Sequence, residues 1–146
     1  MSEEQIKGPI RGFLKSTTQG DVNQSISFLA PDAVWVTQSG TFKGVEEIKK
    51  YISWTINAVK DQKVVETGVG IVVQGNTGII EHTLSGVTRG KKWEVPAMCI
   101  YEFKDDKIIA MRSFMDRLSL AKQGAKGMFE KWFVNAIINA IEKGLH

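Results

Sequence analysis

Cysteine and histidine are scarce in this chain. One cysteine, Cys99, among 146 residues leaves no internal disulfide and no cysteine zinc site. The two histidines, His82 and His146, do not stand with acidic residues at a metal-ligand spacing. No glycine-rich phosphate loop occurs in a strand–turn–helix context. The sequence therefore predicts neither a bound metal nor another cofactor.

Long hydrophobic runs and clusters of one charge are also missing. The longest apolar runs fall far short of the roughly 20 residues that a membrane-spanning helix needs. Basic and acidic residues are interspersed, and the net charge is +3. Lys91-Lys92-Trp93 is the one basic and aromatic string, and a solvated turn explains it better than a nucleic-acid contact. We expect no nucleic-acid partner and no membrane span. The N-terminal MSEEQIKGPI lacks an apolar signal sequence, which favours a cytoplasmic location.

What the chain does have is the composition of an ordinary globular protein. Hydrophobic residues make up 42% of the sequence and charged residues 24%. A length of 146 residues favours one domain with a substantial core.

Helical signals fill the first half of the chain. Gly8-Pro9 suits a helix start, because proline is tolerated in the first turn. Asp21 is placed to cap a second helix whose buried stripe includes Leu29. Residues 33–37 indicate a short strand, and Gly44 opens a third helix with apolar residues at helical spacing.

Strand signals fill the second half. Residues 64–74 and 79–87 have strand-like patterns and are separated by a Gly-Asn turn. Residues 93–116 then predict two strands joined by the charged turn KDDK. Three helices followed by a long antiparallel meander predict an α+β domain with the helices on one side of a sheet.

One face of these strands follows from the alternation of side chains. His82 shares a face with Leu84, and the next two strands present Ala97, Cys99, Tyr101, Met111, Ser113 and Met115. If these faces form one concave surface, they line a mostly apolar pocket with few polar atoms, which is the composition of a small-molecule site.

Residues 125–146 form a C-terminal extension of the predicted domain 1–124. The string AKGMFEKWFVNAIINAIEKGL indicates an amphipathic helix with a wide apolar face. Burying that face contributes on the order of 10 kcal/mol before entropy costs. We expect it to pack on its own domain or on a partner subunit, and either arrangement is compatible with covering the pocket mouth. A membrane surface would favour a lysine-rich polar face, whereas this one is near neutral.

Three strings, in this order and spacing, carry a family resemblance: FLKSTTQGDVNQSISFLAPDAVWV, TFKGVEEIKKYI and CIYEFKDDKIIAMRSFMDRLSLAKQ. Over residues 9–124 the chain resembles the nuclear transport factor 2-like superfamily, and within it the SnoaL-like group. The resemblance implies a cone-shaped, curved antiparallel sheet packed on three helices, with a deep pocket and frequent dimerisation. The superfamily includes ketosteroid isomerases, limonene-1,2-epoxide hydrolases, polyketide cyclases, dehydratases and non-enzymatic binders, so the fold does not fix the function.

The catalytic positions of two of these enzymes are occupied by other residues here. The tyrosine, aspartate base and second aspartic acid of ketosteroid isomerases would fall at Phe13, at about Thr37 and at Cys99. The Arg-x-Asp pair of the epoxide hydrolases would fall at His82 and Leu84. Their second aspartate would fall at Ser113, and Asp116 is interpreted as structural. The resemblance therefore implies neither of these two reactions.

His82 is the strongest candidate catalytic residue. A neutral imidazole accepts a proton near pH 7, provided that a partner such as Thr37, Ser113 or Tyr101 orients it. A buried structural histidine is the alternative. A Cys99 nucleophile would need a nearby cation to lower the pKa of the thiol, and a small buried residue is the alternative there.

The predicted function is the binding of a small apolar or amphipathic molecule in the pocket of a homodimer. The predicted ligand-binding residues are Phe13, Thr37, His82, Leu84, Ala97, Cys99, Tyr101, Met111, Ser113 and Met115. One alternative is an isomerase, cyclase or lyase that acts on a hydrophobic substrate with His82 as acid–base. The other is an oligomerisation or protein-partner module, which predicts a filled cavity.

Overall fold

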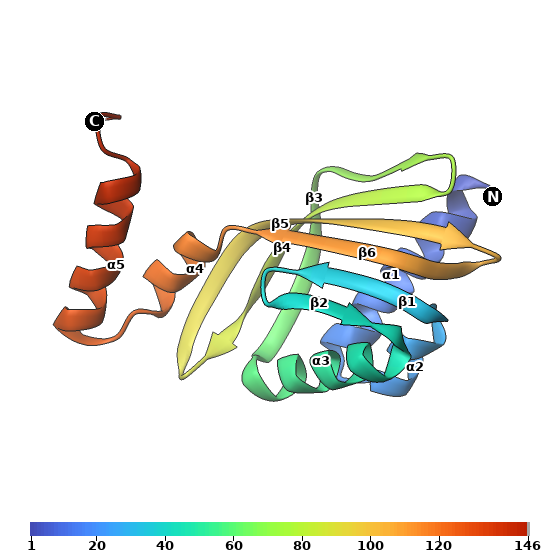
Figure 1. The fold of residues 1–146 in the computed structure, drawn as a ribbon, viewed down its shortest axis with the longest axis horizontal. Helices are drawn as coiled ribbons and strands as arrows, with labels where there is room; N and C mark the ends of the chain where they lie inside the picture. Colours follow the sequence, from blue (N-terminus) through green and yellow to red (C-terminus); the bar gives the residue numbers. More distant parts are fainter. Residues whose placement is uncertain (146) are drawn as a thin grey trace.

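Helices cover one face of a six-stranded sheet, and a further helical segment continues beyond the sheet (Figure 1). The structure, a computed structural model, describes residues 1–145. Its elements confirm the predicted α+β class with a curved sheet, and the two edge strands of that sheet do not pair into a closed barrel. Within the described residues, no helix is both long enough and apolar enough to cross a bilayer.

Helix α1 (Glu3–Thr18) begins earlier than the sequence pattern indicated. The Ser2 hydroxyl accepts a hydrogen bond from the Gln5 N–H, and the Gln5 side chain accepts one from the Ser2 N–H, which makes a capping box. Pro9 consequently lies inside the helix, and the predicted start at Gly8-Pro9 is wrong. Ile6 and Ile10, both fully buried, anchor the helix on either side of this proline.

Helices α2 (Val22–Ser27) and α3 (Gly44–Ala58) lie where they were predicted. Asp21 caps α2, because its Oδ1 accepts a hydrogen bond from the Gln24 N–H at 2.9 Å. The sequence pattern predicts Leu29 as part of this helix, and that prediction is wrong. Leu29 is instead the first residue of a strand and is buried there.

The strands form one sheet in the order β2-β1-β6-β5-β4-β3. Their bounds are Leu29–Thr37 (β1), Gly40–Lys43 (β2), Lys60–Gln74 (β3), Thr77–Thr88 (β4), Lys91–Lys104 (β5) and Lys107–Met115 (β6). The predicted meander from β3 to β6 is confirmed. Strand β2 was not predicted, and β1 pairs with β6 in parallel, with Trp35 opposite Met111.

The core lies between the sheet and α1 and α3. Gly78 on β4 allows α1 to approach closely, because a Cβ there would lie 2.4 Å from Cδ1 of Ile10. Ile48 and Ile52 of α3 are buried in the same layer. A second buried cluster, around Trp93, occupies the other end of the same face, next to α4.

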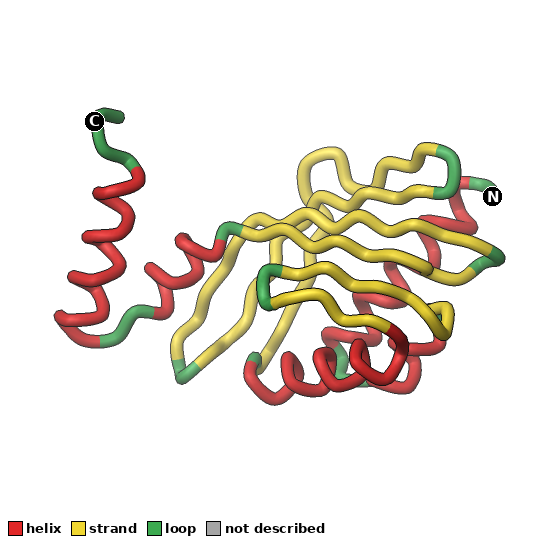
Figure 2. The backbone as a smooth tube through the Cα atoms, viewed as in Figure 1, coloured by secondary structure: helices red, strands yellow, loops and turns green. Residues whose placement is uncertain are grey.

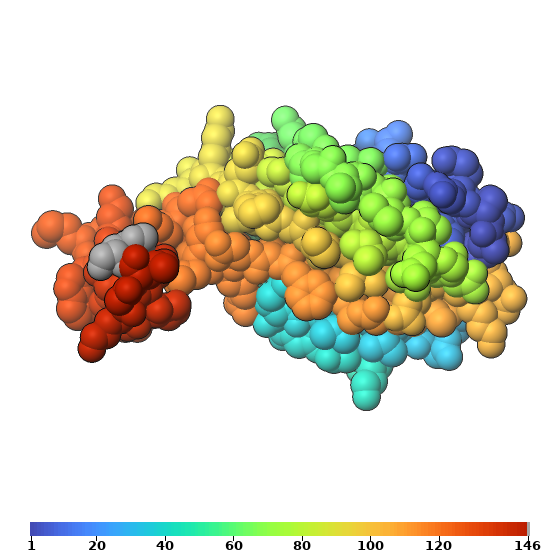
Figure 3. Space-filling model, turned by 90° about the horizontal axis from the view of Figure 1, so that it is seen from above, coloured from blue at the N-terminus to red at the C-terminus, as the bar shows by residue number. Residues whose placement is uncertain are grey.

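The C-terminal segment is two helices, α4 (Arg117–Gly124) and α5 (Gly127–Ile141). The predicted helix over residues 125–145 is therefore shorter at both ends, and His146 lies outside the described residues. Figures 2 and 3 show α5 projecting away from the body of the molecule. Most of its large apolar side chains, including Phe129 and Trp132, are exposed, whereas Val134 and Ile138 are half-buried. Packing on a partner subunit stays a prediction.

Candidate functional site

A cavity of about 610 Å³ lies on the inner face of the sheet, bounded by residues of β4, β5 and β6 and by α1 and α3. Helix α4 and the first two turns of α5 add Leu120, Phe133 and Val134 to its wall. The C-terminal segment therefore takes part in the site, although most of α5 projects away from it.

Most of the predicted ligand-binding residues line this cavity. They are Phe13, His82, Leu84, Ala97, Cys99, Tyr101, Ser113 and Met115. The strand register explains their arrangement, because His82 pairs with Ala97 and Ala97 pairs with Met115. Cys99 and Ser113 form the neighbouring pair on β5 and β6. Their roles in binding a ligand stay a prediction.

The structure places Thr37 and Met111 outside the cavity wall. Thr37 is at the end of β1, where its hydroxyl donates to the Gly40 carbonyl and accepts from the Ser39 N–H. Met111 is fully buried in the core, in register with Trp35 on one side and Tyr101 on the other. The alternation of side chains along the strand gave the correct sheet face for Met111. It could not show that this part of the face is filled by the core and does not line the cavity.

His82 is buried in the cavity wall with 3% of its surface exposed. Its Nδ1 has no hydrogen-bond partner among residues 1–145. The predicted orienting bonds to Thr37, Ser113 or Tyr101 are therefore not made through this atom. Burial lowers the pKa of His82 below its ordinary value of 6.5, and the Ile80 backbone opposes this shift. The imidazole is thus held neutral at pH 7.

Ser113 is the polar centre of the wall. Its Oγ accepts a hydrogen bond from Trp35 Nε1 at 2.8 Å and another from the Cys99 thiol at 3.3 Å. Gln38 Nε2 donates to the Ser113 carbonyl at 2.6 Å. These bonds tie β1 and β5 to β6 and occupy the serine hydroxyl, which leaves it unsuited to a nucleophilic role.

Cys99 and Tyr101 are deeply buried and neutral. Burial raises the pKa of the Cys99 thiol, and the hydrogen bond to Ser113 offsets only part of that shift. Burial also raises the pKa of Tyr101 well above its usual value, with a smaller contribution from the neighbouring Cys99. A reactive thiolate would require a nearby cation to lower the pKa of the thiol, and no cation among the described residues contributes to the pKa shift of Cys99. Cys99 therefore fits the alternative of a small buried residue.

An aromatic wall at one end of the cavity was not predicted from the sequence. Phe13 contacts Trp35 edge-to-face with a centroid distance of 5.7 Å, and Trp35 contacts Tyr51 in the same way at 5.1 Å. Tyr51 in turn stacks against Trp54, and all four rings line the cavity. The sequence did contain one signal for this wall, the spacing of Tyr51 and Trp54 on the predicted third helix. Residues three apart share a helix face, so these two rings could be expected to lie together.

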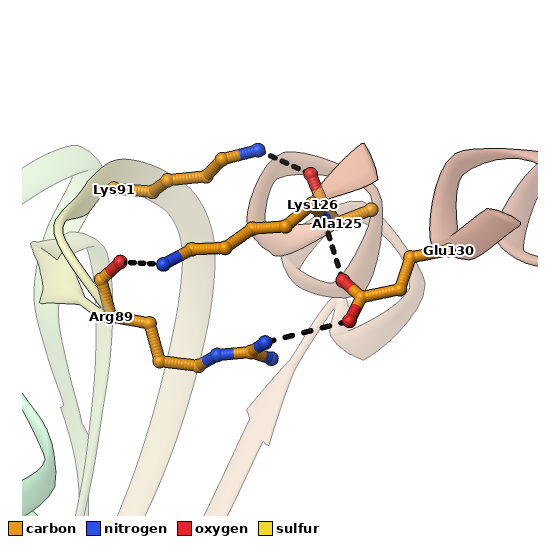
Figure 4. Close-up of polar contacts among 5 residues, drawn as sticks. All are labelled: Arg89, Lys91, Ala125, Lys126 and Glu130. Atoms are coloured by element: carbon orange, nitrogen blue, oxygen red, sulfur yellow. Dashed lines mark hydrogen bonds and ion pairs between the residues drawn. The ribbon is translucent and has the colours of Figure 1, made fainter. Parts of the chain in front are cut away.

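Charged groups lie at the end of the cavity that α4 and α5 form. Arg89, in the β4–β5 turn, pairs with Glu130 of α5 at 3.4 Å, and both are partly exposed. Lys91 and Lys126 donate to the carbonyls of Ala125 and Arg89 respectively (Figure 4). This network fixes the start of α5 on the β4–β5 turn.

The arrangement can enclose an apolar molecule and offer it a few neutral polar groups. No three His, Cys, Asp or Glu side chains of residues 1–145 are placed together to hold a metal ion. The buried polar side chains of the wall, such as His82 and Cys99, are held in their uncharged forms. Such a site binds by shape, apolar contact and a small number of hydrogen bonds.

The fold of this chain is similar to that of ketosteroid isomerase-like and nuclear transport factor 2-like proteins. A protein of this fold from Catenulispora acidiphila, in complex with trimethylamine, matches with a TM-score of 0.74 and 19% identity, covering 82% of this chain and 93% of the other. A predicted SnoaL-like polyketide cyclase from Jannaschia sp. CCS1 matches with a TM-score of 0.78 and 16% identity, covering 88% and 98%. An LEH-like epoxide hydrolase from M. tuberculosis matches with a TM-score of 0.69 and 14% identity, covering 94% and 95%.

The chain belongs to the SnoaL-like domain family, because the model of that family matches residues 10–111. The matched residues include the second half of α1, strands β1 to β5 and the first half of β6, together with most of the cavity wall, and they exclude α4 and α5. Curated protein sequences include no significant match to this chain.

Proposed function

We propose that this SnoaL-like protein binds a small apolar or amphipathic molecule in the cavity, and that it does so as a cytoplasmic homodimer. The observation that carries the ligand proposal is the cavity itself. Its volume of about 610 Å³ lies within the roughly 300–1,000 Å³ that is typical of small-molecule sites. The trimethylamine complex of the Catenulispora protein supports a small-molecule ligand in this fold.

The same cavity weighs against a module that serves only for association with other proteins, since that alternative predicts a filled interior. Exposed apolar side chains on α5 and on the outer face of the sheet support the homodimer. The two proposals are independent, because a dimer can form through surfaces that do not line the cavity.

The ligand proposal is tested by filling the cavity from its centre. Ala97 lies on β5 between His82 and Met115, and its side chain faces the cavity. In Ala97→Phe, we expect the affinity for the neutral fluorescent probe N-phenyl-1-naphthylamine to fall by about tenfold or more, equivalent to about 1.4 kcal/mol. Met98→Phe is the matched control, because Met98 is the next residue on the same strand and is exposed on the opposite face.

Fluorescence titration measures both variants, and circular dichroism checks that each is folded. Equal probe affinity in the wild type and Ala97→Phe would contradict binding in the cavity, since a probe attached to the exposed face of α5 would not sense the substitution. Native mass spectrometry of the purified protein then identifies any molecule carried in the cavity.

An isomerase, cyclase or lyase activity is the second candidate, and the state of His82 is the observation that favours it. The imidazole is neutral, lies in the cavity wall and has a ring nitrogen, Nδ1, with no hydrogen-bond partner within residues 1–145. His82→Ala separates the two proposals. If His82 is an acid–base catalyst, the variant retains ligand binding and loses turnover. A wild-type protein that binds its purified ligand and leaves it unchanged excludes this candidate.

A further inference from the structure

Helix α5 carries an apolar face that its own chain does not cover. Phe129 is 76% exposed, Trp132 is 65% exposed and Phe133 is 53% exposed, and Ile137 and Ile141 continue the same exposed surface. Apart from Glu130, which pairs with Arg89, the polar side chains of α5 form a narrow stripe of Lys131, Asn135 and Asn139. A helix that is apolar over most of its circumference is typical of one buried in a protein interior or interface.

Polar contacts at the base of α5 fix where the helix begins relative to its own sheet. Glu130 pairs with Arg89 and accepts a hydrogen bond from the Lys126 N–H at 2.6 Å. Together with the bonds from Lys91 and Lys126 to backbone carbonyls, these contacts fasten the first turn of α5 to the β4–β5 turn (Figure 4). The remainder of the helix projects outward, as Figure 1 shows.

The outer face of the sheet is a second exposed apolar surface. Phe114 on β6 is 53% exposed, and its register partner Met98 on β5 is 43% exposed. Ile79 and Val72 extend this surface onto β4 and β3. Helices α1, α3 and α4 pack on the inner face through the two buried clusters, so they do not cover this surface.

We propose that two copies of the chain associate so that α5 of each copy packs across the outer sheet face of the other. The proposal rests on the inferred homodimer and not on ligand binding. A reciprocal contact of this kind is the isologous arrangement that two-fold dimers use. It would bury both exposed apolar surfaces of each chain at once.

The dimensions of the two surfaces agree. Helix α5, with 15 residues, is about 22 Å long at 1.5 Å per residue. One row of register partners crosses five neighbouring strands, through Val72, Ile79, Ile100, Arg112 and Val36, and Arg112 is ion-paired with Glu102. This row spans about 19 Å at a strand spacing of about 4.8 Å. If the helix is treated as a cylinder of its own length and about 10 Å wide, half of its lateral surface is roughly 350 Å². With an equal area of sheet, each copy would contribute roughly 700 Å², close to the 800 Å² per partner of a standard interface.

A second copy explains α5 better than a lipid surface does. Helices that lie on membranes carry a broad, basic polar face opposite their apolar face. The polar stripe of α5 carries one charge, that of Lys131, and the charge of Glu130 offsets it. Glu142 and Lys143, just beyond the end of the helix, likewise have opposite charges.

The molar mass of exposed-residue variants tests the proposal. Light scattering after gel filtration should give twice the 16.2 kDa chain mass for the wild type. Trp132→Glu on α5 and Phe114→Glu on β6 should each halve that mass. Asn57→Glu is the control, because Asn57 is exposed on α3, outside both the proposed interface and the cavity wall, and this variant should remain dimeric.

Cross-linking distinguishes contact in trans from other dimers. Ile137→Cys and Phe114→Cys are purified separately, mixed and treated with a hexane-spaced bismaleimide. We expect a covalent dimer that contains one chain of each variant, and none when Asn57→Cys on α3 replaces the Phe114 variant. The native Cys99 is only 7% exposed, so the unsubstituted chain provides the background.

The outcomes separate the proposals from one another. A monomeric wild type overturns both this contact and the homodimer, and sedimentation of that monomer with phosphatidylserine vesicles would assign α5 to a lipid surface. A dimer that persists in Phe114→Glu, or that cross-links only Ile137→Cys to itself, overturns the α5–sheet contact and leaves the homodimer standing. Binding of N-phenyl-1-naphthylamine reports on the cavity separately.

Discussion

The titration of His82 should make the stability of the protein depend on pH. The imidazole is 3% exposed, and burial lowers the pKa of the folded state below 6.5. The unfolded chain therefore binds a proton at this residue more readily than the folded chain does. Since protons favour the state that binds them more tightly, the free energy of unfolding falls as the pH drops through 6.5 toward the folded-state pKa. Above that window the contribution is constant.

The size of the effect has a firm upper limit. One proton can change the free energy of unfolding by at most about 1.4 kcal/mol per pH unit. The unfolding entropy is about 2.1 cal/mol/K per residue, which for this chain amounts to about 0.3 kcal/mol/K. We therefore expect the Tm to fall by no more than about 5 °C for each pH unit below the onset.

Urea unfolding between pH 5.5 and 7.5 measures this dependence. Carboxyl groups with lowered pKa values, such as Glu66 and Glu130, titrate below 4.5 and so outside that range. His82→Gln should abolish the slope, whatever its effect on overall stability, whereas His146→Gln should retain it. A slope that survives in His82→Gln, or a wild-type stability that rises as the pH falls, would refute the reasoning.

Three further predictions concern the hydrogen bonds and the thiol. Ser113→Ala should lower the free energy of unfolding by about 1–3 kcal/mol, because it removes the acceptor of the Trp35 indole N–H. In the double variant with Trp35→Phe, the loss of unfolding free energy should be smaller than the sum of the losses in the two single variants. Strictly additive losses in urea unfolding would contradict the hydrogen bond. Ser2→Ala should cost about 0.5–2 kcal/mol and reduce the helicity of α1, and an unchanged circular dichroism melt would exclude the cap. Cys99 should react with a disulfide reagent about ten times or more slowly than a cysteine placed at the exposed Asn57, and equal rates would show that the site is open.

The inner face of the sheet could be predicted from the sequence because alternation along a strand is a local property. His82, Leu84, Ala97 and Cys99 all lie on the predicted face. The register of β4, β5 and β6 keeps these alternating sets in phase across neighbouring strands. Much of the candidate site thus followed from the period of the strands alone.

Features that depend on contacts between distant segments could not be predicted in this way. The parallel pairing of β1 with β6 brings Trp35 next to Ser113, which is 78 residues away along the chain. The aromatic wall needs α3 to deliver Tyr51 against β1. Competing local signals explain the other errors, since Pro9 concealed the capping box that begins α1 at Glu3.

Burial without nearby countercharges limits the chemistry that the cavity can perform. It lowers the pKa of His82 and raises those of Cys99 and Tyr101, so each group is held in its uncharged form at neutral pH. A reaction that needs a preformed thiolate, phenolate or imidazolium would have to overcome this burial for every turnover. Binding an uncharged ligand incurs no such cost, because His82, Cys99 and Tyr101 are already neutral. An acid–base role for His82 therefore requires the substrate itself to supply the orienting hydrogen bond that Nδ1 lacks within residues 1–145.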